Sequence, residues 1–377
     1  MTRSRKTSSG TNSSFRRPAD TERDSALRIA ILGAGAVGSV LGSLLWRAGE
    51  DVVLVGRAAH VAAIHAAGLD VQGVLGGFRA TPRAEERLSS RPELALLTVK
   101  TQDVAAALKD NLAFLDGVPI VVLQNGLAGE DLAASVVPRS QIVSGIVSLH
   151  AQYLVPGHVV LMQSEGLTIG RPDGPADETV ERIRRVLDKA VPTTTCANMR
   201  GARWTKLVVN LNNVLPALTG ASFRDVFADR FLRRLAVGLM REGIAVAERS
   251  GIRFEPLPGT PVPVVRLVRY LPAALAGGVA ARKAAKLETH WPLKGSTWQS
   301  VTRMRPTEID YLNGEIVRAG RRAGVPTPLN ETVVALMRRV EDERRFLTPR
   351  EVEVALARSP LPGPARRALG WRGSAES

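Results

Sequence analysis

Three polar residues interrupt an otherwise apolar segment at 203–214, which reads RWTKLVVNLNNV. At about 100° per residue along a helix, Lys206, Asn210 and Asn213 fall within roughly 60° of one another and form one stripe. A lysine ammonium placed there can stabilise negative charge developing on an oxygen and can donate a proton. The amides can hydrogen-bond hydroxyl or carboxylate groups and orient a small molecule. Spacing alone fits equally well a lysine snorkelling at a helix edge and two amides that join neighbouring helices.

A glycine-rich turn near the N-terminus predicts a nucleotide site. Residues 28–32 form a short β-branched run, and GAGAVG at 33–38 then opens a predicted helix. In such a unit Gly33 permits the tight turn, Gly35 lets a pyrophosphate approach the backbone, and Gly38 lets helix and strand pack closely. A ligand-free α/β domain can carry the same turn. The expected cofactor-binding residues are Gly33, Ala34, Gly35, Ala36, Val37 and Gly38.

The end of the second predicted strand, DVVLVGR, favours one of the two nicotinamide cofactors. NAD-binding units usually place an acidic residue about 20 positions after the glycines, where it binds the ribose hydroxyls. Gly56 and Arg57 hold that place here. Because a guanidinium suits the 2′-phosphate of NADP, we predict NADP, the alternative for Arg57 being a solvated surface charge.

Two further strands are predicted to end in polar residues. LALLTVK ends at Lys100, and VPIVVLQNG contains Asn125. Strands alternate with helical segments, which predicts a doubly wound parallel sheet of the Rossmann type. Such sheets bind ligands at the carboxyl ends of their strands. Lys100 alone could be a surface charge, but the shared location of both residues favours a binding role.

The chain is predicted to contain two folded domains. Residues 27–198 form the α/β cofactor domain, which ends with a hairpin (YLVPGHVVLM), a short strand (GLTIG) and an amphipathic helix. Residues 199–355 form an all-helical substrate domain, flanked by a disordered basic leader at 1–26 and a basic tail at 356–377. No role is assigned to the proline-rich segment 254–294. The predicted helices span 202–219, 228–250, 262–287, 296–323 and 330–343.

Composition limits the possible function classes. The chain has 377 residues, of which 45% are hydrophobic, enough for two sizeable cores. A single cysteine fits a reducing, cytoplasmic setting, and no apolar run is long enough to span a membrane. The five histidines are scattered, so no metal site is expected. The net charge of +15 comes without base-stacking aromatic stretches, which argues against nucleic-acid binding and favours a basic solvated surface.

Taken in order, the motifs resemble those of the ketopantoate reductase (2-dehydropantoate 2-reductase) family. The resemblance runs from Arg28 to about Met337. It rests on GAGAVG at 33–38, VK at 99–100, QNG at 124–126, RWTKLVVN at 203–210, STWQ at 296–299 and RPTEIDYLNG at 305–314. It implies an NADPH-dependent reductase of a small 2-keto acid, above all 2-dehydropantoate, in the cytoplasmic route to pantothenate and coenzyme A.

The resemblance also assigns roles to individual residues. Lys206 would be the catalytic proton donor, and Asn210 and Ser296 would bind substrate. The cofactor would be held by residues 33–38 and by Arg57, Lys100, Asn125, Gln152 and Glu308, where Gln152 is placed by the preceding His-Ala pair.

The sequence departs from the family pattern in two places. Val214 stands where the family has a second asparagine, and Asn213 is expected to replace it as a substrate ligand. Ser-Thr-Trp-Gln-Ser at 296–300 replaces Ser-Met-x-Gln-Asp, so Trp298 leaves open another branched 2-keto acid or an imine as the substrate. Ser296 could instead cap a helix, with Gln299 completing a capping box. A non-catalytic NADP-binding regulatory protein is a further alternative, and a homodimer is possible.

Overall fold

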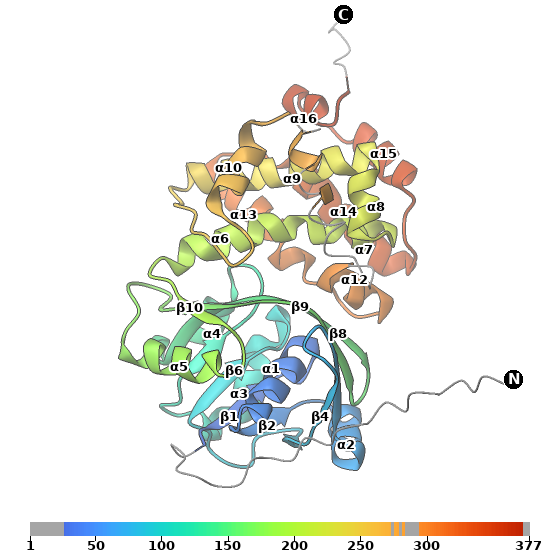
Figure 1. Cartoon of the computed structure of the whole chain (residues 1–377). Helices are drawn as coiled ribbons and strands as arrows, with labels where there is room; N and C mark the ends of the chain where they lie inside the picture. The colour runs from blue at the N-terminus through green and yellow to red at the C-terminus, as the bar shows by residue number, and fades with distance from the viewer. Residues whose placement is uncertain (1–25, 273–274, 279–280, 283–293, 372–377) are drawn as a thin grey trace, which may run out of the picture.

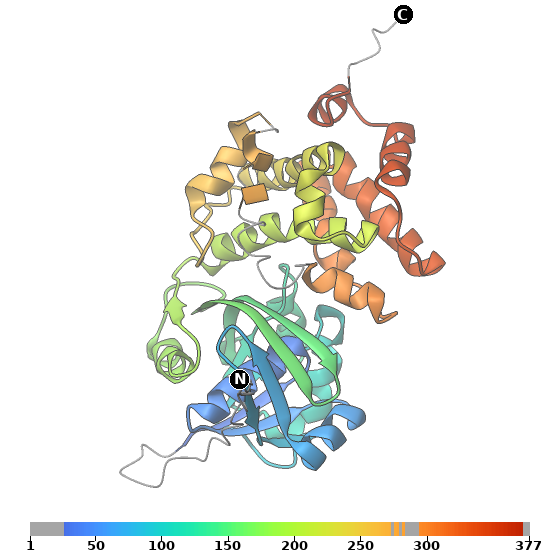
Figure 2. The same ribbon diagram turned by 45° about the vertical axis from the view of Figure 1, so that its right-hand side comes forward.

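The computed structural model describes residues 26–272, 275–278, 281–282 and 294–371 (Figure 1). All but the last residue of the leader expected at 1–26 lies outside these ranges. Within them, no helix has the length and hydropathy that crossing a membrane would require. The described chain forms a sheet-based lobe followed by a helical lobe, as predicted (Figures 1 and 2).

One sheet organises the first lobe, with strand order β4-β3-β9-β8-β7-β6-β1-β2-β5 and β10 paired to β9. Its centre is parallel, as predicted. The central strands are continuous apolar runs because both faces of the sheet are covered. In β1, Ile29 and Ile31 face one core, and Ala30 and Leu32 face the other. The strands are β1 (Arg28–Leu32), β2 (Asp51–Val55), β3 (Leu69–Gly73), β4 (Phe78–Ala80), β5 (Arg83–Glu85), β6 (Leu94–Leu97), β7 (Ile120–Val122), β8 (Ile142–Val155), β9 (His158–Gly170) and β10 (Thr193–Thr195).

Helices cover both faces of this sheet. Residues of α1 and α5 share a core with one face, and residues of α3 and α4 share a core with the other. The helices are α1 (Ala36–Arg47), α2 (Ala58–Ala67), α3 (Val104–Asn111), α4 (Gly129–Ala134) and α5 (Glu178–Asp188).

The long antiparallel pair β8 and β9 confirms the predicted hairpin but corrects the strand that was to follow it. GLTIG is the last part of β9 and not a separate strand. The pairing shifts register at three places along β8, so the ribbon bends without ending. At Gly166, φ is +111°, a value that favours glycine and lets the strand continue past an irregular point.

The helical lobe packs around a single hydrophobic core that extends from Trp204 to Leu369. The segment with the polar stripe runs as α6, a 3₁₀ turn at Leu211–Asn213, and α7. In Figures 1 and 2, α6 and α12 lie on the side of this lobe next to the sheet. The helices are α6 (Met199–Asn210), α7 (Val214–Thr219), α8 (Phe223–Ala228), α9 (Arg230–Arg249), α10 (Val262–Tyr270), α12 (Gly295–Thr302), α13 (Asn313–Ala323), α14 (Pro328–Glu343), α15 (Pro349–Arg358) and α16 (Gly363–Ala368).

Two predicted helices are wrong in extent. The single helix expected at 296–323 is divided into α12 and α13, because Met304 adopts φ of +51° and Pro306 lacks a backbone N–H. The helix expected at 262–287 ends at Tyr270, ahead of Pro272. Much of its remainder lies outside the described ranges.

The C-terminal end of the described chain is packed onto the helical lobe. Residue 356 lies inside α15, and the following α16 places Leu369 in the core. Trp371 stacks on Phe231 of α9, with ring centroids 6.3 Å apart. The basic segment expected as a tail from 356 therefore contributes apolar side chains to this lobe as far as residue 371.

Candidate active site

The glycine turn between β1 and α1 is tightly enclosed at its two ends. Gly33 has φ of +115°, and a Cβ atom there would lie 2.5 Å from the backbone nitrogen of Val99. A Cβ atom on Gly38 would lie 2.2 Å from the carbonyl oxygen of Gly33 and 2.5 Å from Oγ1 of Thr98. Both distances are far below van der Waals contact, so only glycine fits these two positions.

The middle of the turn is open. Gly35 is exposed at the N-cap of α1, and no described residue other than its own chain and helix neighbours lies within 4 Å of the position its Cβ atom would take. Among the described residues, no side chain caps this end of α1. The first backbone N–H groups of α1 include those of Ala36 and Val37. Together with the helix dipole, they can bind an anion. The turn therefore fits the pyrophosphate of a dinucleotide.

The end of β2 lies directly against this turn. The backbone N–H groups of Gly33 and Ala34 both donate to the carbonyl oxygen of Val55, at 3.0 and 2.8 Å. A Cβ atom on Gly56 would lie 2.8 Å from that of Ala34. Arg57 follows, exposed at the N-cap of α2. Arg57 is thus exposed next to the position that the adenosine half of a dinucleotide would occupy beyond the turn.

Lys100 and Glu308 form an ion pair between the two lobes. Nζ of Lys100 lies 2.5 Å from Oε2 of Glu308, whose other oxygen accepts hydrogen bonds from the backbone N–H and the hydroxyl of Thr101, at 3.0 and 2.8 Å. The Glu308 side chain is 5% exposed, against 39% for Lys100. Burial by itself would raise the pKa of Glu308, but the charge and hydrogen bond of Lys100 and the bonds from Thr101 together hold that pKa below its ordinary value. Glu308 is therefore a buried carboxylate at the carboxyl end of β6.

The loop after β7 meets the helical lobe at Asn125 and Gly126. Nδ2 of Asn210 donates to Oδ1 of Asn125 at 3.0 Å. Gly126 has φ of +82°, and a Cβ atom there would lie 2.3 Å from the carbonyl oxygen of Tyr311. Asn210 on the stripe of α6 therefore faces the carboxyl end of the sheet, the edge at which sheets of this kind bind ligands.

Lys206 and Asn213 occupy the remainder of this stripe. Lys206 is partly exposed and lies one turn before Asn210 on α6. The 3₁₀ turn carries Asn213 to the start of α12, where its Oδ1 lies 3.3 Å from the position of a Cβ atom on Gly295. Asn213 is thereby brought beside Ser296. Because α12 begins at Gly295, with Lys294 as an N-cap whose side chain makes no capping hydrogen bond, the capping box suggested for Ser296 and Gln299 is not formed.

Gln152 lies in β8, where α12 packs on the strand. Nε2 of Gln299 donates to the carbonyl oxygen of Ala151 at 3.2 Å, and Arg303 donates to that of Tyr153. The carbonyl groups on either side of Gln152 are thus held by α12, which contains Ser296, and by the residue that follows this helix. Trp298, on the same helix, packs against the core of the helical lobe.

Several residues at this junction were missed in the sequence. The most extensively bonded is Arg203, which is 5% exposed and pairs with Glu130 of α4. One signal was present, since Arg203 precedes Lys206 by three positions and lies on the same stripe. Thr101 also follows Lys100 directly, but its contact with Glu308 depends on pairing of distant segments and leaves no local pattern.

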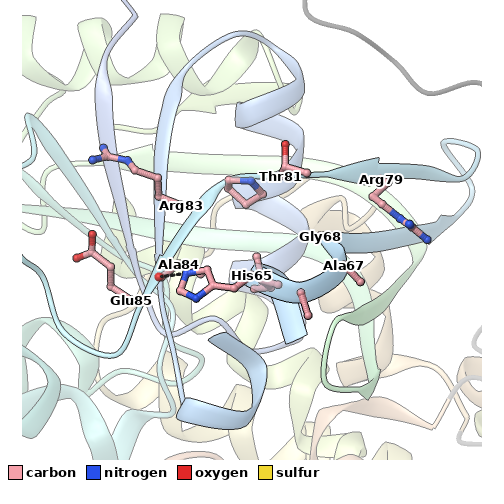
Figure 3. Close-up of a pocket in the computed structure, with 11 residues that line it drawn as sticks. His65, Ala67, Gly68, Arg79, Thr81, Arg83, Ala84 and Glu85 are labelled. Carbon is pink, nitrogen blue, oxygen red and sulfur yellow. Dashed lines mark hydrogen bonds between the residues drawn. The ribbon is translucent and has the colours of Figure 1, made fainter. Parts of the chain in front are cut away.

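A hollow of about 810 Å³ lies elsewhere on the first lobe, along α2, β4 and β5 (Figure 3). Nε2 of His65 lies 2.8 Å from the carbonyl oxygen of Ala84, and Arg79 and Arg83 lie at its edges. None of its lining residues belongs to the predicted site. The described residues contain no group of three or more histidine, cysteine or acidic side chains placed to bind a metal ion.

Known proteins resemble this chain over most of its length. Residues 29–174 match the family described as Ketopantoate reductase PanE/ApbA, and residues 198–341 match its C-terminal part. The 2-dehydropantoate 2-reductase of Pyrococcus horikoshii is 29% identical over 318 residues, covering 84% of this chain and 98% of the relative.

Solved structures share the arrangement of both lobes. The PanE/ApbA family ketopantoate reductase of Ralstonia eutropha is 29% identical, with a TM-score of 0.71 over 84% of this chain and 99% of that one. D-mandelate dehydrogenase, solved with NADH and anilino(oxo)acetate, has the same TM-score and the same coverage of both chains at 23% identity, which shows a shared fold.

Proposed function

The chain belongs to the ketopantoate reductase PanE/ApbA family, and we propose that it reduces a small 2-keto acid with NADPH. We propose 2-dehydropantoate as the preferred substrate and pantoate as the product, which would feed the synthesis of pantothenate and coenzyme A. The name of the Pyrococcus horikoshii relative supports this choice. The single observation that carries the proposal is the stripe of α6 facing the carboxyl end of the sheet, where Asn210 bonds to Asn125.

In this mechanism Lys206 is the acid. Reduced nicotinamide, when bound, supplies a hydride to the carbonyl carbon, so negative charge develops on the carbonyl oxygen. The ammonium of Lys206 stabilises that charge and donates the proton that completes the alcohol. Loss of one such donor typically costs about 10²–10³ in rate.

The neighbouring residues orient the substrate. Asn210 and Asn213 hydrogen-bond its hydroxyl or carboxylate oxygens, and Ser296 contributes a hydroxyl from the start of α12. Glu308 already neutralises the ammonium of Lys100. The charged partner proposed for the substrate carboxylate is therefore Lys206, assisted by the hydroxyl of Ser296 and by these two amides. Lys100, Asn125, Gln152 and Glu308 serve the cofactor.

The substrate is tested with purified protein, NADPH and a panel of 2-keto acids, with pantoate formation measured directly. The proposal predicts the highest kcat/KM for 2-dehydropantoate. The panel includes another branched 2-keto acid and benzoylformate, the 2-keto acid that corresponds to mandelate. A higher kcat/KM for either would overturn the substrate but not the reaction. NADPH oxidation that requires an added amine would indicate an imine reductase.

Arg57 is proposed to select NADPH over NADH. A charge-assisted hydrogen bond contributes about 1.5–3 kcal/mol, so Arg57→Ala is expected to weaken NADPH binding by about 10-fold or more and to leave NADH binding unchanged. The dissociation constants of both cofactors provide the measurement, with Arg79→Ala as an exposed control on the same lobe. Equal losses for the two cofactors would contradict the role.

A further inference from the structure

Arg203 reaches from α6 into the first lobe with all of its donor groups engaged. Nε donates to Oγ of Ser144 at 2.9 Å, and the guanidinium pairs with Glu130. The two terminal nitrogens donate to four backbone carbonyl oxygens at the carboxyl end of β7, in the loop after it and in the first part of β8, those of Val122, Gln124, Gly126 and Gly145, at 3.0–3.4 Å. Only a planar fork with five N–H groups can satisfy such a set, which lysine cannot do.

These bonds attach α6 to the loop after β7 at two places. Arg203 binds the carbonyl groups on both sides of Asn125, and Asn210 of the same helix binds the Asn125 side chain. The two residues are separated by seven positions, or two turns, so they lie on the same face of α6. Lys206 lies between them, three positions after one and four before the other. Its helix can neither rotate nor slide without breaking one of these attachments.

The loop that receives these bonds is itself held. Nε2 of Gln124 donates to the carbonyl oxygens of Leu97 and Val99 at the end of β6, both at 2.9 Å. On its other side, Gly126 packs on the carbonyl group of Tyr311. The attachment point for α6 is therefore fixed to the same strand end that carries Lys100.

The pairing with Glu130 explains how a guanidinium can be buried at this junction. Glu130 is 6% exposed and accepts a hydrogen bond from Oγ of Ser144 at 2.5 Å. Replacing a buried ion pair by apolar side chains is often neutral or stabilising, so stability alone is a poor reason for this arrangement. Its specific consequence is geometric, because it joins one orientation of α6 to one conformation of the Asn125 loop.

We propose that Arg203, neutralised by Glu130, is a positioning residue that sets Lys206 against the bound nicotinamide and substrate. The inference rests on the proposed function, because Lys206 must be the proton donor for its position to matter. It predicts that Arg203 acts on turnover through Lys206. A misplacement of about 1 Å at a reacting group can cost about 10²-fold in rate.

A double-mutant cycle tests this dependence. Arg203→Lys is expected to lower kcat about 100-fold in the wild-type background and less than about threefold in Lys206→Ala, because effects of residues that act as a unit are not additive. A purely structural role would lower the melting temperature and give equal factors in both backgrounds, which would overturn the proposal. Arg200→Lys, at an exposed position on the same helix, is the control expected to change neither quantity.

Amide hydrogen exchange gives a second readout that does not require turnover. In Arg203→Lys, the backbone amides of residues 122–127 and of residues 203–213 are both expected to exchange faster. Unchanged exchange in either segment would contradict the proposed attachment of α6 to the loop after β7. If no keto acid of the panel supported NADPH oxidation by the wild-type protein, the proposed function would fail. Hydrogen exchange would still show whether Arg203 attaches α6 to the loop after β7. If Arg203→Lys did not fold, Glu130→Gln, which keeps the shape of the side chain, would be tested in the same cycle with the same expectations.

Discussion

In the first lobe the candidate cofactor contacts begin with six consecutive residues, 33–38, whereas the helical lobe contributes the candidate residues Lys206, Ser296 and Glu308 from three separate segments. The glycine turn offers backbone N–H groups and, at Gly35, space that no side chain fills. The helical contribution works through side chains that bond across the junction, such as Asn210 with Asn125. The first site is thus a local property of the chain, and the second depends on how the two lobes dock.

The largest effect is expected where the local site is most crowded. Gly38→Ala would place a Cβ atom 2.2 Å from the carbonyl oxygen of Gly33, and the backbone cannot yield cheaply there. Overpacking of this kind costs about 1–3 kcal/mol, and the contact with backbone puts this case at the upper end. Urea unfolding without cofactor measures the loss.

The matched control for this prediction is Gly35→Ala. Nothing lies within 4 Å of the new Cβ atom, so the free energy of unfolding should stay unchanged. NADPH binding should weaken nevertheless, because the methyl group would keep the pyrophosphate from the backbone. Equal unfolding losses in the two variants would remove the distinction between the enclosed and the open glycine.

The ion pair between the lobes should respond asymmetrically to loss of either partner. Lys100→Met leaves the carboxylate of Glu308, which is 5% exposed, without its counter-charge, whereas Glu308→Gln leaves an ammonium that is 39% exposed and can be hydrated. We expect Lys100→Met to cost about 2 kcal/mol of unfolding free energy near pH 7 and Glu308→Gln less than about 1 kcal/mol.

The pH dependence follows from the same pair. Because the pKa of Glu308 is held below its ordinary value, the stabilisation is present above the unfolded pKa and is lost as pH falls through the folded one. Unfolding curves from pH 7 downward measure it. A larger loss of unfolding free energy near pH 7 for Glu308→Gln than for Lys100→Met would contradict the deeper burial of the Glu308 side chain.

A pH-dependent effect is expected from a polar network inside the helical lobe. The carboxylate of Glu242 accepts hydrogen bonds from the backbone N–H groups of Leu329 and Asn330 and from the Asn330 side chain. Oδ1 of Asn330 accepts from Asn313, which also donates to the carbonyl oxygen of Leu211 in the 3₁₀ turn after α6. Burial raises the pKa of Glu242 to about 7, although these bonds oppose the rise.

A carboxyl group whose pKa is raised by folding stabilises the folded state at pH values below its pKa in the unfolded chain. This contribution is lost as pH rises through its pKa in the folded protein. As pH rises from about 4.5 to 7, wild type loses this contribution and Glu242→Gln does not. The unfolding free energy of Glu242→Gln should therefore rise by about 2 kcal/mol relative to that of wild type across this range. His60 is the contrasting group of the first lobe, since burial lowers its pKa to about 4 and its contribution is lost as pH falls. A difference between Glu242→Gln and wild type that does not vary with pH would contradict the raised pKa.

Much of the first lobe could be predicted from the sequence, because its signals are local. The β-branched run at 28–32, the three glycines and the strand end at Arg57 all lie within one β-α-β unit. The predicted helix at 296–323 failed because a positive φ at Met304 and a proline divide it, and neither feature interrupts the apolar pattern. The short strands β3, β4 and β5 were missed. Although β3 and β4 pair locally, β3 also pairs with the distant strand β9, and β5 pairs with β2.

The candidate site was predictable as a set of residues but not as a network. Lys206 and Asn210 lay on a visible stripe, and Asn213 was brought beside Ser296 only by the 3₁₀ turn. Arg203 had a position on the stripe but no visible partner, because Glu130, Ser144 and the loop carbonyl groups become neighbours only when the lobes dock. Local periodicity therefore predicts which face of α6 is used, and the tertiary contacts determine what it meets.

The central claim is that the ammonium of Lys206 stabilises the charge formed on the substrate oxygen. The most direct test is single-turnover oxidation of bound NADPH by the best 2-keto acid, followed by nicotinamide absorbance in wild type, Lys206→Ala and the exposed control Lys109→Ala. We expect a rate about 10²–10³ lower for Lys206→Ala only, with the NADPH dissociation constant changed by less than about threefold. A Lys206→Ala rate equal to that of wild type would contradict the assignment.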